Sequence, residues 1–125
     1  LGTGLVIWHI DGTIVEAYAL SNLVNSPGYV GGPAHPGVLV VEADGNFDMI
    51  KVNFPPSLNY GQCSDTWVVG RTWDDNTTPN ARLWDGTTSN LSVRVKDEID
   101  GSLHLVVRVG APVYDQIAFL PMVKK

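Results

Sequence analysis

Apolar and polar residues alternate with a period of two along much of this chain, which is the spacing of side chains along a β-strand. Residues 91–95 show this alternation, and a second apolar segment, 103–109, follows the turn pair Asp100-Gly101. Shorter apolar runs that also predict strands lie at residues 5–10, 38–41, 47–52 and 117–120. The run at 5–10 does not alternate, so we expect it to be covered on both faces, with Trp8 in the core.

Turn and loop signals separate these segments. Asp44-Gly45-Asn46 lies between two of the apolar runs, and an Asp-Gly pair in that place is a strong hairpin signal. Residues 25–37 and 72–90 are rich in turn-forming residues and predict long loops, and residues 14–23 are the helix candidate. The pattern predicts an all-β fold, an antiparallel β-sandwich-like domain with long Gly/Pro-rich loops. We expect one domain over residues 1–125, with 110–125 as a tail or an edge strand.

The amino-acid composition excludes several classes of protein. With 125 residues, 44% of them hydrophobic and 17% charged, the chain can bury a core and is not of the disordered type. The net charge of −5 and the lack of a basic patch argue against nucleic acid as a partner. No apolar run reaches the ~18 residues of a membrane span, and one cysteine excludes an internal disulfide. Because the chain begins directly at a strand-like segment, we interpret it as a piece of a longer polypeptide.

His9 and Asp11 raise the question of catalysis, because alternate side chains of a strand share a face and place the two together with Leu5 and Ile7. A His-Asp pair belongs to some catalytic triads, but the sequence has no GxSxG motif. The three histidines lie in separate segments and form no HExxH zinc motif. We therefore interpret His9 as a structural histidine that hydrogen-bonds within a packed layer, and Asp11 as a cap on the turn at Gly12. No catalytic residue and no zinc ligand is predicted.

The acidic turn carries a better chemical signal. Asp44, Asn46 and Asp48 place oxygen donors at alternate positions around a glycine turn, and the pattern D-x-N-x-D is a common way to supply three ligands to calcium. Asp65 is a further candidate from elsewhere in the fold. The alternative is a plain Asp-Gly hairpin whose acids face water, since no acidic residue closes the loop in the following segment.

Tryptophans give a second candidate site. Trp73 and Trp84 lie in polar loops, where exposed rings would form a platform for stacking on a sugar. The alternative is that each ring anchors its long loop onto the sheets.

Three ordered blocks carry a family resemblance: GTGLVIWHID, HPGVLVVEADGNFD and TTPNARLWDGTTSNLSVRV. Together, over residues 2–109, they resemble the C-terminal β-rich part of the immune inhibitor A family of secreted zinc metallopeptidases. The family's catalytic HExxH motif is absent here, so no catalytic role is carried over. In that family a Gly-Asp-x-x-Asp-like stretch is associated with calcium. The nearest match here is residues 61–65, with Gln62 in place of the first aspartate and Asp65 as a candidate ligand.

The resemblance implies a function. It implies a non-catalytic accessory segment of a secreted or cell-surface bacterial protein, packed beside the adjacent catalytic domain and stabilised by calcium. The chain alone is then no enzyme, although its parent would be a zinc-dependent endopeptidase. The alternative is a stand-alone β-sandwich module that binds polysaccharide or protein.

Overall fold

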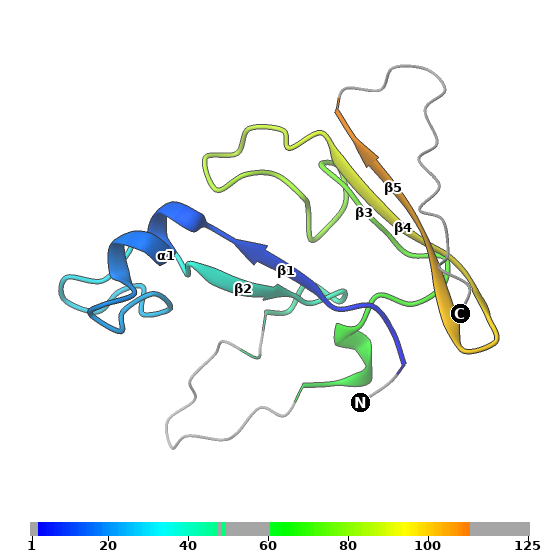
Figure 1. The fold of residues 1–125 in the computed structure, drawn as a ribbon, viewed down its shortest axis with the longest axis horizontal. Coiled ribbons are helices and arrows are strands. Elements are labelled where there is room, and N and C mark those ends of the chain that lie inside the picture. Colours follow the sequence, from blue (N-terminus) through cyan, green and yellow to red (C-terminus); the bar gives the residue numbers. More distant parts are fainter. Residues whose placement is uncertain (1–2, 48, 50–60, 111–125) are drawn as a thin grey trace.

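The chain is built from two small antiparallel β-sheets joined by long loops (Figure 1). The computed structural model describes residues 3–47, 49 and 61–110. The first sheet pairs β1 with β2, and the second has the order β3-β4-β5. The elements are β1 (Ile7–Ile10), α1 (Gly12–Tyr18), β2 (Val38–Val41), the 3-10 turn η1 (Cys63–Asp65), β3 (Thr72–Trp73), β4 (Leu91–Ile99) and β5 (Ser102–Val109). The predicted β-rich antiparallel character is confirmed.

The first sheet has one covered face and one exposed face. Ile7 and His9 lie on the inner side of β1, whereas the outward Trp8 and Ile10 are 58% and 61% exposed. The expectation that this segment is covered on both faces, with Trp8 in the core, is therefore wrong. An apolar run predicts a strand, but it does not reveal whether a second layer packs on each side.

Asp11 fixes the start of the single α-helix in the described residues. Its Oδ1 atom accepts hydrogen bonds from the backbone N–H groups of Thr13 and Ile14, at 2.9 and 3.2 Å. An aspartate N-cap satisfies donors that the first helical turn leaves without partners. The predicted capping role of Asp11 is confirmed, and it places the helix at Gly12–Tyr18 rather than at 14–23.

The predicted hairpin at Asp100-Gly101 is confirmed. Both residues have positive φ angles, +51° and +76°, which suit the tight turn between β4 and β5. The turn at Asp44-Gly45 also forms, with Gly45 at φ +75°. However, Phe47 after it has φ +48° and lies outside any strand, so a strand does not begin there. The rest of the predicted strand 47–52, apart from Met49, lies outside the described residues, as does the run at 117–120.

The core lies between the two sheets. Val41 of β2 and the following Ala43 meet Trp67, Trp73 of β3 and Val95 of β4, all at most 6% exposed. Trp73 is buried because its side chain points from β3 into this cluster. Of the two roles that the sequence left open for Trp73, its burial fits the anchor and not the exposed platform.

Candidate functional site

Three acidic side chains converge where β2 ends. Glu42, Asp44 and Asp65 each bring a carboxylate oxygen to within 4.8 Å of the other two. Glu42 and Asp44 follow β2 directly, whereas Asp65 comes from η1, about twenty residues later in the chain. The fold thus gathers three negative charges in a space of the size that one cation fills.

One backbone and one side-chain hydrogen bond hold the two segments of this acidic cluster together. The N–H group of Ala43 donates to the carbonyl oxygen of Asp65 at 2.9 Å. The hydroxyl of Ser64 donates to Oδ2 of Asp44, also at 2.9 Å. These contacts fix η1 against the turn after β2, so the arrangement of the carboxylates does not depend on flexible side chains alone.

Asp44 is organised by its own turn. Its Oδ1 accepts from the backbone N–H of Asn46, and its Oδ2 accepts from the side-chain amide of the same residue, each at 3.0 Å. The hydrogen bond from the backbone N–H of Asn46 is the main reason why the pKa of Asp44 lies below its usual range. Burial opposes this shift. Hydrogen bonds from the side chains of Ser64 and Asn46 and the charge of Arg71 lower the pKa further. Asp44 is therefore held ionised, and the amide oxygen of Asn46 is the ligand atom that this residue can supply.

Asp65 carries the most informative atom of the cluster. The residue is 5% exposed, and its Oδ2 accepts from the backbone N–H of Gln62. Its Oδ1 is buried and has no hydrogen-bond partner among the described residues. A buried carboxylate oxygen without a partner is costly, because it loses its hydration and gains nothing in return. A bound cation would supply the missing interaction.

Glu42 is the most deeply buried member, with 0% exposure, and its Oε1 accepts from the backbone N–H of Met49 at 3.0 Å. The sequence prediction did not include Glu42 as a ligand, although it lies two residues before Asp44. The sequence did offer the spacing of two acidic residues, Glu42 and Asp44, directly before Gly45. Of the predicted calcium ligands, Asp44 and Asp65 lie in the cluster, Asn46 contacts Asp44, and Asp48 lies outside the described residues.

The donor set of the acidic cluster consists of oxygen atoms. Hard cations such as Ca²⁺ and Mg²⁺ prefer carboxylate, amide and carbonyl oxygens, whereas zinc sites usually contain histidine or cysteine. No histidine or cysteine of the described residues belongs to the cluster. The residues therefore fit a hard divalent cation such as Ca²⁺.

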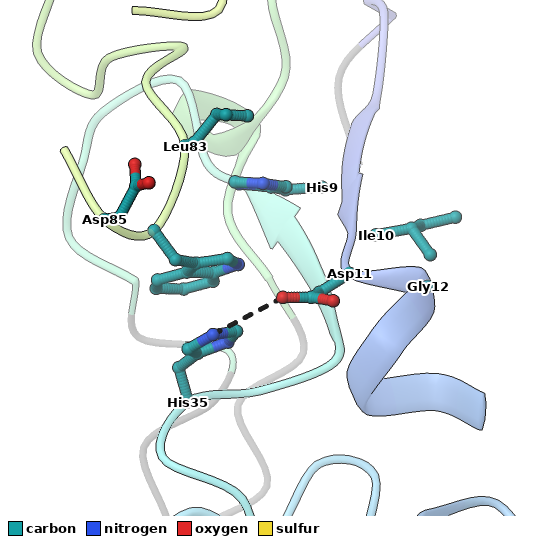
Figure 2. A pocket seen from close by; sticks show the side chains of 8 residues that line it. His9, Ile10, Asp11, Gly12, His35, Leu83 and Asp85 are labelled. Carbon is teal, nitrogen blue, oxygen red and sulfur yellow. Dashed lines mark ion pairs between the residues drawn. The ribbon is translucent and has the colours of Figure 1, made fainter. Parts of the chain in front are cut away.

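A hollow lies at the other end of the β1–β2 sheet, where β1 ends and α1 begins. It has a volume of about 600 Å³ and is lined by β1, the start of α1 and two loops (Figure 2). Within it the ring of Trp84 is stacked between His9 and His35, with ring centroids 5.1 and 4.2 Å away and interplanar angles of 17° and 13°. Asp11 pairs with His35, at 3.5 Å from Oδ2 to Nε2, and not with His9 (Figure 2). His9 is thus half-buried and acts here through ring stacking.

This stack bears on the predicted sugar platform. Trp84 is 40% exposed, but both faces of its indole are covered by imidazole rings. Trp73 is 6% exposed and packs near Trp67. The two rings therefore do not form a common exposed surface, and the alternative role as loop anchors describes their contacts better.

Comparisons with protein-family models, curated proteins and solved structures gave no match to this chain. Among the described residues, none forms a helix of the length and apolar character needed to cross a membrane. The site must therefore be interpreted from its own geometry.

Proposed function

We propose that this chain is a non-catalytic, sandwich-like accessory segment of a secreted metallopeptidase-like protein, in which Glu42, Asp44 and Asp65 hold a structural calcium ion. The observation that carries the calcium site is the buried Oδ1 of Asp65, which lacks a described partner and belongs to a cluster of three converging carboxylates. The place of this segment in a metallopeptidase-like protein rests on the sequence resemblance.

Charge repulsion supports a bound cation. Like charges this close destabilise one another, and the effect is stronger away from water. Glu42 and Asp65 are both buried, so solvent screens their charges poorly. A divalent ion would convert this repulsion into attraction. The amide of Asn46, backbone carbonyl groups and water would complete the six to eight oxygen ligands that calcium takes.

The position of the cluster supports a structural role. Ala43 and Thr66, the neighbours of its acidic residues, are buried, and Ala43 belongs to the core cluster. An ion here would join the turn after β2 to η1, two segments that are about twenty residues apart in the chain. Extracellular calcium modules work with dissociation constants of about 10⁻⁴–10⁻³ M, which suits a secreted protein.

Thermal unfolding in EDTA and in excess calcium tests the proposal. A ligand at about 100 times its dissociation constant adds about 2.7 kcal/mol to the free energy of unfolding. For a domain of this size we expect Tm to rise by roughly 10 °C. The same Tm measurement with Mg²⁺ shows whether the site prefers Ca²⁺, the larger of the two ions.

Asp65→Asn sharpens the test. The amide retains an acceptor for the Gln62 N–H but removes one charge from the cluster. In EDTA we expect this variant to be at least as stable as the wild type, because a buried charge is gone. The addition of calcium should raise the Tm of this variant much less than that of the wild type. Asp100→Asn, which removes a charge from the distant β4–β5 turn, is the matched control and should respond to calcium like the wild type. Equal Tm values for the wild type in EDTA and calcium would refute the calcium site.

A further inference from the structure

Arg71, immediately before β3, reaches across to the acidic cluster. Its Nη1 donates a hydrogen bond to the carbonyl oxygen of Ala43, the residue between Glu42 and Asp44. Its backbone is fixed by bonds to Val68 and to Val95 of β4. A positive charge from the second sheet is therefore held beside a turn that belongs to the first.

The contacts of the Arg71 guanidinium show how its positive charge acts on the acidic cluster. The guanidinium lowers the pKa of Asp44 through its charge, after the hydrogen bonds from Asn46 and Ser64. No ion pair within 4.0 Å joins Arg71 to an acidic residue among those described, so its charge acts at longer range and does not occupy the cation position.

We infer that Arg71 is a built-in counter-charge that weakens the affinity of the acidic cluster and matches it to a divalent cation. This inference rests on the proposed calcium site. The three carboxyl groups carry a formal charge of −3 when all are ionised. With the guanidinium beside them the sum is −2, which one divalent ion neutralises.

The sign of the effect follows from Coulomb's law. Removing the guanidinium removes a repulsion with the bound ion, and this repulsion is proportional to the ion's charge. Arg71 is largely exposed, so water screens its charge and the effect is moderate. We expect Arg71→Gln to bind Ca²⁺ about 3–10 times more tightly than the wild type, with a larger gain for La³⁺.

Two further variants separate charge from hydrogen bonding. Gln at position 71 retains an N–H donor for Ala43, so a purely structural role of the bond would leave affinity unchanged or reduce it. Arg71→Lys keeps the charge and should bind like the wild type. Arg94→Gln removes a charge from the exposed face of β4 and is the matched control.

Isothermal titration of all four proteins with CaCl₂ and LaCl₃ decides the matter. Tighter binding by R71Q alone, with the larger gain for La³⁺, supports the inference. Equal or weaker binding by R71Q overturns it while leaving the calcium site intact. Absence of calcium binding in the wild type and R71Q alike overturns both proposals.

Discussion

Protonation of the His9 side chain is coupled to folding and makes the stability of the protein depend on pH. Burial is the main reason why the pKa of His9 lies below its ordinary value of 6.5; Asp11 opposes this shift and His35 adds to it. A histidine whose pKa is lowered by folding takes up protons more readily in the unfolded chain. The stability that it contributes is therefore present above pH 6.5 and is lost as the pH falls below that value.

His9→Phe tests this link. Phenylalanine retains a ring to stack on Trp84 but cannot take up a proton. We expect the wild type to lose more free energy of unfolding than the variant between about pH 7.5 and about pH 5.5, measured by urea unfolding at both values. Titrating groups that do not interact with His9 are common to the two proteins, so their contributions cancel in the comparison. Equal losses would show that the protonation of His9 is not linked to folding.

At the scale of elements, the β4–β5 hairpin depends on its two-residue turn. Gly101 has φ +76°, and a Cβ atom built there meets no other atom within 4 Å. Any effect of Gly101→Val therefore comes from backbone strain, which for a left-handed residue is about 1–2 kcal/mol. We expect a loss of that size in the free energy of unfolding, measured with urea.

Gly12→Ala is the matched control for this prediction. Gly12 also has open space around the position of a Cβ atom, but it is the first residue of α1 and its φ is not in the left-handed region. Alanine there should be neutral or slightly stabilising, because it favours helix more than glycine does. A loss in G12A as large as that in G101V would exclude backbone strain as the cause.

The elements that the sequence predicted well are those decided by neighbouring residues. The Asp11 cap and the Asp100-Gly101 turn depend on contacts within three residues, and both form as expected. Trp8 was placed incorrectly and the role of Trp73 was left open, because the burial of each ring depends on which sheet packs over it. The proximity of Glu42 and Asp65 could not be predicted either, since it depends on how a segment distant in sequence returns to the end of β2.

At the scale of the whole molecule, Trp67 holds the two sheets together. Its backbone pairs with Leu5 just before β1, with both N···O distances at 2.9 Å. Its indole N–H donates to the carbonyl of Val41 in β2 at 2.8 Å, and its ring lies 6.5 Å from that of Trp73 in β3. At 2% exposure, Trp67 is part of the core that both sheets share.

Trp67→Phe should therefore destabilise the molecule as a unit. The change leaves the buried Val41 carbonyl without its donor and opens a small cavity, which together should reduce the free energy of unfolding by about 2–4 kcal/mol. Trp8→Phe, at a position that is 58% exposed, should change it by less than about 0.5 kcal/mol. Urea unfolding followed by far-UV circular dichroism and by tryptophan fluorescence provides the measurement. Because the core is common to both sheets, the two signals should change together in all three proteins; separate transitions would mean that the sheets are stable independently and that Trp67 does not join them.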